Sequence, residues 1–216
     1  MKTDLAAVTK PLLRGHFHQA AFFFALGACA MLIAASHDVT AVIANIIYSL
    51  SLTGLFGISA LYHRPQWRPE ARMWMRRLDH AAIFILIAGT GTPIALLAIP
   101  GESGKRFLTI IWIAAAIGVI QSLFWVKAPK WLAAILYIIM GWLAVPYMSE
   151  IKNALGQGSV TTLLIGGVIY TLGALVYAFK RPNPAPRVFG YHEIFHLLVI
   201  VAAAFHFVVI AGLVMR

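Results

Sequence analysis

Residues 193–215 read EIFHLLVIVAAAFHFVVIAGLVM and carry one formal charge, at Glu193, when histidine is neutral. At about 1.5 Å per residue, an apolar helix of this length crosses the ~30 Å hydrocarbon core of a bilayer. No period-2 alternation typical of a membrane barrel strand is present. Six further apolar segments have similar lengths, at 17–36, 39–62, 78–98, 107–126, 131–148 and 160–179. The pattern predicts an all-α integral membrane protein, a bundle of seven transmembrane helices.

The composition excludes a water-soluble globular protein, because 61% of the 216 residues are hydrophobic and only 11% are charged. The net charge is +10, but the basic residues are scattered in short loops between the apolar segments. This placement is typical of membrane topology rather than of nucleic-acid binding. The single cysteine, Cys29, excludes an internal disulfide. Without repeats or a soluble insertion, residues 1–216 are expected to form one seven-helix domain, with 1–16 as a cytoplasmic or interfacial N-terminal segment.

The distribution of lysine and arginine predicts the orientation of the bundle. The opposite face has only four such residues, Lys105, Arg106, Lys152 and Arg216. The N-terminal segment and alternate loops hold the others, which are Lys2, Lys10, Arg14, Arg64, Arg68, Arg72, Arg76, Arg77, Lys127, Lys130, Lys180, Arg181 and Arg187. Because positively charged loops stay in the cytosol, we expect a cytoplasmic N-terminus, an external C-terminus and a multi-pass protein of the cell inner membrane.

Ionisable groups inside a membrane are costly and often mark functional sites. The second predicted helix ends near Ser59 and His63, the third begins near Asp79, and the seventh begins near His192 and His196. All five residues are therefore expected in the cytoplasmic leaflet. Since His192 and His196 are four residues apart, they share one helical face. With His63 they form a three-imidazole set that suits zinc and leaves a position for water, from which Asp79 could take a proton.

The stretch GYHEIFH (190–196) contains His-Glu-x-x-His, the signature of zinc metalloproteases. An intramembrane metalloprotease is therefore an alternative. However, the aspartate of the site-2 intramembrane proteases follows the histidine pair, whereas Asp79 precedes it. Glu193 is rotated by about 100° from its neighbour His192 on the helix and is free to point elsewhere.

Other interpretations of the histidines remain open. A haem between His63 and His196 would leave the nearby serine and aspartate without a role. His206 lies too far along its helix to share an ion with the pair, and we expect a structural role for it. We expect His16 and His18 to lie at the membrane interface.

Four stretches together resemble the hemolysin III family, the bacterial branch of the progestin and adipoQ receptors, in a superfamily that includes the alkaline ceramidases. They are KPLLRGHFHQ (10–19), SALYHRPQW (59–67), RRLDHAAIFILIAGTGTP (76–93) and FGYHEIFH (189–196). The resemblance covers the whole seven-helix core. The family pattern reads AGTYTP where this chain has AGTGTP, so Gly91 is expected to alter the cavity or the kink before the following proline.

The resemblance implies a fold with seven helices and a cytoplasmic N-terminus. It also implies a zinc ion held by His63, His192 and His196. Asp79 would contact the zinc-bound water, and Ser59 would hydrogen-bond an oxygen of the substrate.

These expectations favour a zinc-dependent hydrolase acting on an amide or ester of a membrane lipid. Zinc would activate water and polarise the carbonyl, Asp79 would be the general base, and Ser59 would stabilise the oxyanion. The partners would be membrane lipids, including a small amphiphilic substrate or ligand. The alternative is a non-catalytic regulator or sensor of membrane lipid state with structural zinc and, from the family name, a haemolytic phenotype. A zinc transporter or a pore is disfavoured because the polar cluster is confined to one leaflet.

Overall fold

The computed structural model describes residues 10–125 and 128–215, and an isolated bridge between Ala185 and Phe189 is the only strand-like pairing in these ranges. Lys2, Lys127 and Arg216, which contributed to the predicted orientation, lie outside the described residues. So do the first nine residues of the predicted N-terminal segment and the last residue of the predicted helix 107–126.

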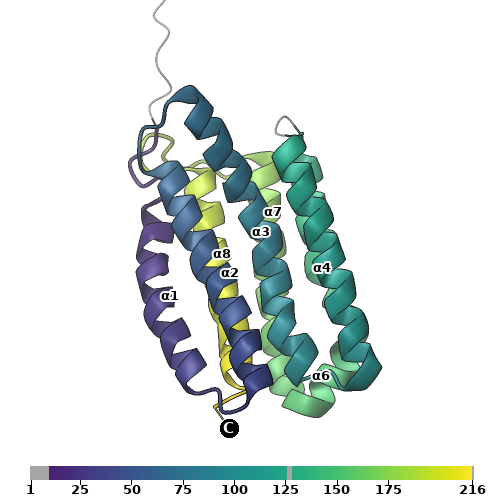
Figure 1. Ribbon diagram of the computed structural model, residues 1–216. Helices are drawn as coiled ribbons and strands as arrows, with labels where there is room; N and C mark the ends of the chain where they lie inside the picture. Colours follow the sequence, from purple (N-terminus) through teal and green to yellow (C-terminus); the bar gives the residue numbers. More distant parts are fainter. Residues whose placement is uncertain (1–9, 126–127, 216) are drawn as a thin grey trace, which may run out of the picture.

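The described residues form a bundle of long helices that run roughly side by side (Figure 1). In chain order the elements are α1 (His16–Ala34), α2 (Val39–His63), α3 (Pro69–Leu97), α4 (Gly101–Phe124), α5 (Lys130–Gly141), the 3-10 helix η1 (Trp142–Tyr147), α6 (Met148–Leu155), α7 (Gln157–Phe179) and α8 (Tyr191–Ala211). Seven helical segments are long and apolar enough to cross a membrane, with α5, η1 and α6 counted together as Lys130–Leu155. The predicted all-α bundle of seven spans is confirmed.

Two helices begin earlier than predicted. Helix α3 begins at Pro69 rather than at residue 78, because Pro69 suits the first helical turn and Glu70 lies where the helix dipole favours a negative charge. Arg76 and Arg77 therefore lie on a helix and not in a loop. Helix α4 begins at Gly101, within the predicted connection, again with an acidic residue in its first turn.

The predicted helix 131–148 is interrupted. Helix α5 ends at Gly141, a 3-10 segment containing Pro146 follows, and α6 continues to Leu155. Proline has no N–H to donate and its ring clashes with the preceding turn, so Pro146 disfavours a regular α-helix at this position. The span remains continuous in length but changes helical type near its middle.

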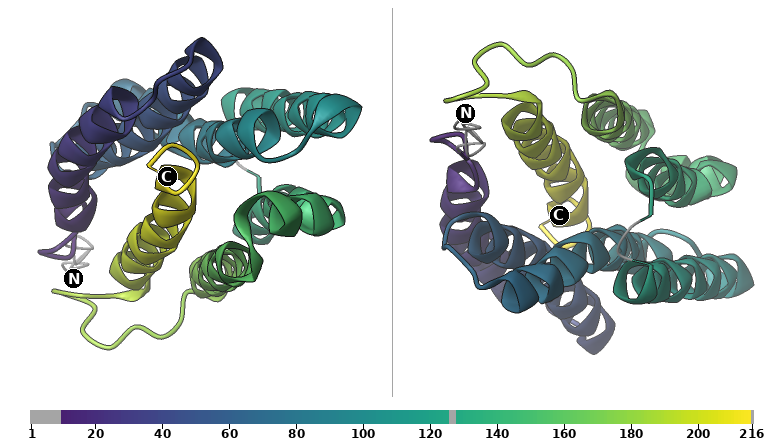
Figure 2. Two further views of the ribbon diagram at one scale, coloured as in Figure 1. Left: turned by 90° about the horizontal axis from the view of Figure 1, so that it is seen from below. Right: turned by 90° about the horizontal axis from the view of Figure 1, so that it is seen from above.

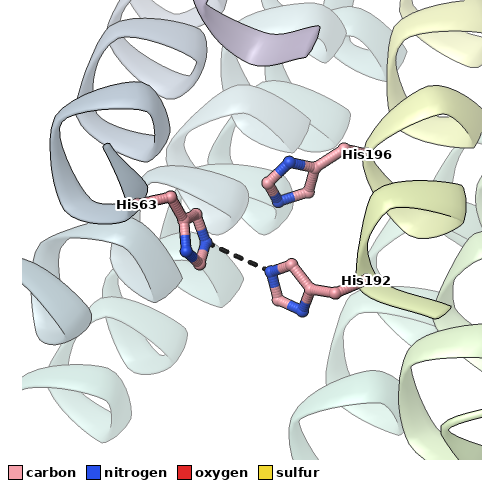
Figure 3. A group of neighbouring side chains, drawn as sticks. All are labelled: His63, His192 and His196. Carbon is pink, nitrogen blue, oxygen red and sulfur yellow. Dashed lines mark hydrogen bonds between the residues drawn. The ribbon is translucent and has the colours of Figure 1, made fainter. Parts of the chain in front are cut away.

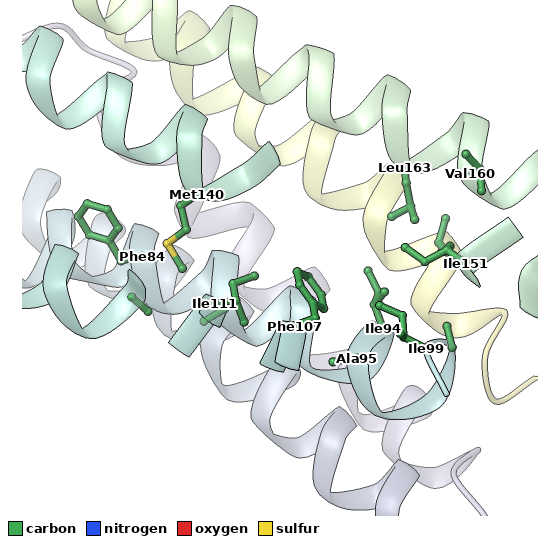
Figure 4. Packing of buried hydrophobic residues seen from close by; sticks show 14 of the residues in the cluster. Phe84, Ile94, Ala95, Ile99, Phe107, Ile111, Met140, Ile151, Val160 and Leu163 are labelled. Carbon is green, nitrogen blue, oxygen red and sulfur yellow. The ribbon is translucent and has the colours of Figure 1, made fainter. Parts of the chain in front are cut away.

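Helix α8 lies inside a ring formed by the other helices, as the views along the bundle show (Figure 2). One apolar core packs α1, α2, α3 and α8 together. A second core joins α3 and α4 to α5, α6 and α7, with Phe84, Phe107 and Ile151 among its most buried side chains (Figure 4). Helix α3 contributes to both cores, so it fixes the two halves of the bundle relative to each other.

Helices α2 and α3 approach closely at Gly89, where a Cβ atom would lie 2.6 Å from the Cβ of Ser51. Small residues at such crossings are typical of membrane helix packing. We expect Gly89→Ala to lower stability by about 1–3 kcal/mol, because overpacking forces the helices apart. Gly54→Ala is the control, since nothing lies within 4 Å of a Cβ there. Thermal unfolding in detergent measures both, and equal stabilities would contradict the close approach.

Candidate metal centre

Three buried histidines from two helices converge at one end of the bundle (Figure 3). His63 is the last residue of α2, and His192 and His196 lie one turn apart at the start of α8. Each offers a ring nitrogen, and these nitrogens lie within 4.8 Å of one another. The Nε2 atoms of His63 and His192 are 3.1 Å apart. The arrangement brings together the three histidines that the spacing singled out, and the group could hold a metal ion.

The two predicted polar partners lie beside this group. An oxygen of the Asp79 carboxyl is 3.8 Å from Nε2 of His63. Ser59 precedes His63 by four residues on the same face of α2, and its side chain lies next to the Asp79 carboxyl. Both residues are buried, at 2% exposure for Ser59 and 9% for Asp79. All five predicted site residues therefore lie in one cluster.

The donor set fits a metal ion better than it fits a closed hydrogen-bond network. Buried polar atoms nearly always have a hydrogen-bond partner, and those that lack one need an explanation. Nδ1 of His196 has no partner among the described residues. Three imidazoles with one carboxylate nearby are typical of a site for zinc or a similar transition metal.

His18 is also part of this cluster, and its predicted interfacial position is wrong. Its exposure is 2%, and its ring stacks on that of His196 with centroids 3.8 Å apart and planes 8° apart. Neither of its ring nitrogens has a hydrogen-bond partner among the described residues. His16 is exposed and contacts Arg64. His18 therefore fixes the plane of the His196 ring.

Two other intramembrane histidines have their own hydrogen bonds. Nδ1 of His80 pairs with the carbonyl of Arg76 at 2.8 Å, and its Nε2 pairs with the hydroxyl of Tyr177 at 3.1 Å. Nε2 of His206 pairs with the carbonyl of Leu163 at 3.2 Å. These hydrogen bonds satisfy ring nitrogens of both residues outside the group of three converging rings.

The acidic residue of the His-Glu-x-x-His stretch points away from the imidazoles. Glu193 is fully buried and forms an ion pair with the Nε of Arg14. Its second oxygen accepts a hydrogen bond from the backbone N–H of Gly190 at 2.8 Å, which closes the first turn of α8. Both oxygens are thus engaged in holding the chain at this end of the helix.

Residues 10–15, here called the N-terminal strap, lie across this end of the bundle. The backbone N–H groups of Leu12 and Leu13 donate to the carbonyls of Arg187 and Val188, at 3.0 and 3.2 Å. Lys10 donates to the carbonyl of Arg64 at 3.0 Å. Burial, followed by the positive charges of nearby arginines, lowers the pKa of Lys10. The strap ties the loop before α8 to the end of α2, and so holds the two ligand-bearing helices together.

The strap ends at Gly15, whose φ of +82° is strained for any residue with a side chain. A Cβ at this position would also lie 2.8 Å from the Cβ of His63. Glycine is therefore needed both for the turn into α1 and for close contact with His63.

We expect Glu193→Gln to lower the stability by about 2–3 kcal/mol, because it leaves the charge of Arg14 without its partner in a largely buried position. This cost is below the roughly 3–5 kcal/mol typical of breaking a fully buried pair, because Arg14 keeps 19% exposure. Arg14→Gln should cost a similar amount, and the double variant should cost less than the sum of the two. Thermal unfolding measures the coupling. Metal content should be unchanged, and a Glu193→Gln protein of normal stability that lost its metal would contradict this structural role.

A cavity of about 140 Å³ extends from the cluster into the bundle. Asp79, Ser59, His18 and His196 line it at one end, and most of its other lining is apolar. His206, ten residues beyond His196 on α8, also lines it, so the cavity extends about 15 Å along the helix.

Gly91 lines the same cavity, and a Cβ there would lie 2.7 Å from the Cδ1 of Ile111. A tyrosine at this position would therefore have to displace the Ile111 side chain, and would change the shape of the cavity.

The amino-acid sequence is similar to those of known proteins over most of its length. Residues 6–207 match the family described as "Haemolysin-III related". Hemolysin-3 of Bacillus cereus is 34% identical over 168 residues, which cover 78% of this chain and 74% of that protein. The Hemolysin-3 homolog of Bacillus subtilis (strain 168) is 30% identical over 158 residues, or 73% and 71% of the two chains. The human monocyte to macrophage differentiation factor is 29% identical over 168 residues, or 74% and 66%. With seven apolar helices and a match of this extent, the chain is a multi-pass membrane protein and belongs to the haemolysin-III related family.

Proposed function

We propose that this protein is a zinc-dependent hydrolase acting on an amide or ester of a membrane lipid. The observation that carries the proposal is the convergence of three buried imidazoles and one carboxyl group at the end of a largely apolar cavity. An apolar cavity suits an acyl chain, and a polar cluster at its end suits the carbonyl to which that chain is attached.

His63, His192 and His196 would hold the zinc ion. When bound, zinc would supply Lewis acidity and make a water molecule acidic at neutral pH. Asp79 would accept the proton from the attacking water, since its carboxyl lies 3.8 Å from His63. Ser59, beside Asp79 on the cavity wall, would donate a hydrogen bond to the carbonyl oxygen as negative charge develops there.

The site would lie at the cytoplasmic side of the membrane. Basic residues of the N-terminal strap and of the α2–α3 connection, among them Lys10, Arg14, Arg64 and Arg68, gather at the end of the bundle that carries the histidines. By the positive-inside rule this end faces the cytosol, in a cell inner membrane, with membrane lipids as the partners. One seven-helix domain would then account for the whole activity.

An intramembrane protease is less well supported. The glutamate of His-Glu-x-x-His acts as general base in metalloproteases, but here both oxygens of Glu193 are engaged, by Arg14 and by the N–H of Gly190. A better second candidate is a non-catalytic regulator of membrane lipid state with structural zinc. The burial of all three histidines, at 9% exposure or less, favours it, since closed sites are typical of structural zinc.

Incubation of the purified, zinc-loaded protein with ceramide and with phospholipid esters in mixed micelles tests the proposal. We expect release of fatty acid, detected by mass spectrometry, that a zinc chelator stops and added zinc restores. A non-chelating isomer of the chelator is the control and should have no effect. Stoichiometric zinc without release from any of these lipids would favour the structural role instead.

A further inference from the structure

A second polar site lies on the other side of His80 from the histidine cluster. Four helices form a recess there, here called the basic recess: α3 contributes Arg76, Arg77 and His80, α4 contributes Gln121 and Ser122, α5 contributes Lys130, and α7 contributes Tyr177. No carboxylate is among the described residues that line it. Three basic side chains around one recess without a carboxylate among its described lining indicate a site for an anion.

The cations of the basic recess are held in place but not neutralised. The Nζ of Lys130 donates to the hydroxyl of Tyr191 at 3.1 Å and lies 4.4 Å from the ring centre of Tyr177. The guanidinium carbon of Arg77 lies 4.4 Å from the ring centre of Trp74. The Nε of Arg77 is buried and has no hydrogen-bond partner among the described residues. Within the described ranges no carboxylate forms an ion pair with Lys130, Arg76 or Arg77.

The chemistry of these groups favours phosphate. Guanidinium groups donate in a planar fork that matches two phosphate oxygens, and an ammonium group adds a point charge. Gln121 and Ser122 add neutral donors on the facing helix. An anion here would take up the unpaired Nε–H of Arg77 and remove the mutual repulsion of the three cations.

Three exposed tryptophans near the recess indicate that it lies at the depth of lipid headgroups. Trp125 lines it, Trp74 stacks on Arg77 and Trp131 follows Lys130 in the chain, and their exposures are 54%, 54% and 58% in the order Trp125, Trp74, Trp131. Exposed tryptophans in a membrane protein gather at the boundary between hydrocarbon and headgroups. Basic pockets between transmembrane helices at this level bind anionic lipid headgroups.

From this arrangement we propose that the basic recess binds the phosphate group of an anionic membrane lipid. The site is distinct from the histidine cluster and does not depend on zinc. The two are nevertheless adjacent, because an Asp79 oxygen is 4.0 Å from Nδ1 of His80, and the rings of Tyr177 and His192 lie 5.8 Å apart. A bound headgroup would therefore stiffen the wall between the two sites.

Thermal unfolding of the purified full chain in detergent, titrated with dioctanoyl phosphatidic acid, tests the proposal. We expect a saturable rise in Tm. Dioctanoylglycerol, which has the same chains and no phosphate, should give none. Inorganic phosphate distinguishes the sources: a rise at millimolar phosphate equal to that with the lipid would assign the site to free phosphate and overturn the lipid assignment.

Variants locate the site. Arg76→Gln/Arg77→Gln should weaken the apparent affinity for phosphatidic acid by about tenfold or more, because it removes charge-assisted hydrogen bonds. Arg72→Gln, an exposed arginine of the same helix that does not line the recess, is the matched control and should bind like the parent protein. Equal affinities in the double variant and in the control would overturn the proposal, as would a rise in Tm with dioctanoylglycerol as large as with phosphatidic acid.

A near-isosteric variant, Gln121→Glu, tests the site even if the double variant does not fold. Gln121→Glu brings a carboxylate to the recess and should raise the Tm of the lipid-free protein, because it neutralises part of the positive charge. It should also reduce the rise that phosphatidic acid produces. A lower Tm without lipid, or an unchanged response to phosphatidic acid, would contradict the proposed anion site.

Discussion

A His196→Ala variant is expected to lose its bound metal during purification, whereas a His206→Ala variant keeps it. His196 is 1% exposed and its ring faces those of His63 and His192, with centroids 5.1 and 4.6 Å away. Removing an outer-shell partner of a metal ligand typically costs about 10–100-fold in affinity, and removing a ligand itself should cost more.

His206 is a suitable control because it lies on the same helix, is equally a histidine, and has a partner of its own in the carbonyl of Leu163. Metal content is measured by elemental analysis on monodisperse protein from size-exclusion chromatography. Equal metal in the two variants would remove His196 from the site. Loss in both would indicate a general defect of α8 and not the loss of a ligand.

An Asp79→Asn variant is expected to keep its metal and lose turnover by about 10²–10⁴-fold, the usual contribution of a general base. The substitution preserves the size of the side chain and its place beside Ser59 and His63, but the amide cannot accept a proton from water. The measurement is the rate of fatty-acid release from the substrate that the parent protein hydrolyses fastest.

Asp38→Asn is the matched control for Asp79. Asp38 caps the far end of α2, where its side chain accepts a hydrogen bond from the N–H of Ala41 at 2.9 Å. The Asp38→Asn variant should retain full turnover, since asparagine also caps helices well. Unchanged turnover in Asp79→Asn would contradict the role of general base, and loss of metal in that variant would make Asp79 a ligand instead.

The sequence was sufficient to predict the helical class and the convergence of the three imidazoles. Both depend on local patterns: apolar segments of membrane-spanning length, and a pair of histidines four residues apart at the same depth as His63. Hydropathy does not detect a polar extension at the end of a membrane-spanning helix. The apolar pattern therefore does not predict that α3 begins at Pro69. The hydropathy pattern also does not show the interruption at η1, which the proline at position 146 could have indicated.

The position of His18 could have been predicted from periodicity. The buried residues of α1 are His18, Ala21, Ala25, Cys29 and Leu32, which recur every three or four positions and form one helical face. The short polar stretch around His18 by itself suggests the membrane interface, whereas the pattern over the whole helix places the ring toward the bundle interior.

The partner of Glu193 could not have been predicted in this way. Arg14 lies 179 residues earlier in the chain, and only the folded bundle brings the N-terminal strap against the start of α8. A motif describes the residues within it, but the role of each one depends on what packs against it from elsewhere. The basic recess likewise forms only in the folded bundle, because its cations come from two helices, α3 and α5.

X-ray absorption at the zinc K-edge of the purified, zinc-loaded protein tests the central claim most directly. If His63, His192 and His196 hold one ion, the first shell contains three imidazole nitrogens at about 2.0–2.1 Å, with the multiple scattering typical of imidazole rings. Zinc that fails to bind stoichiometrically, or a first shell of oxygen or sulfur without imidazole, would contradict it.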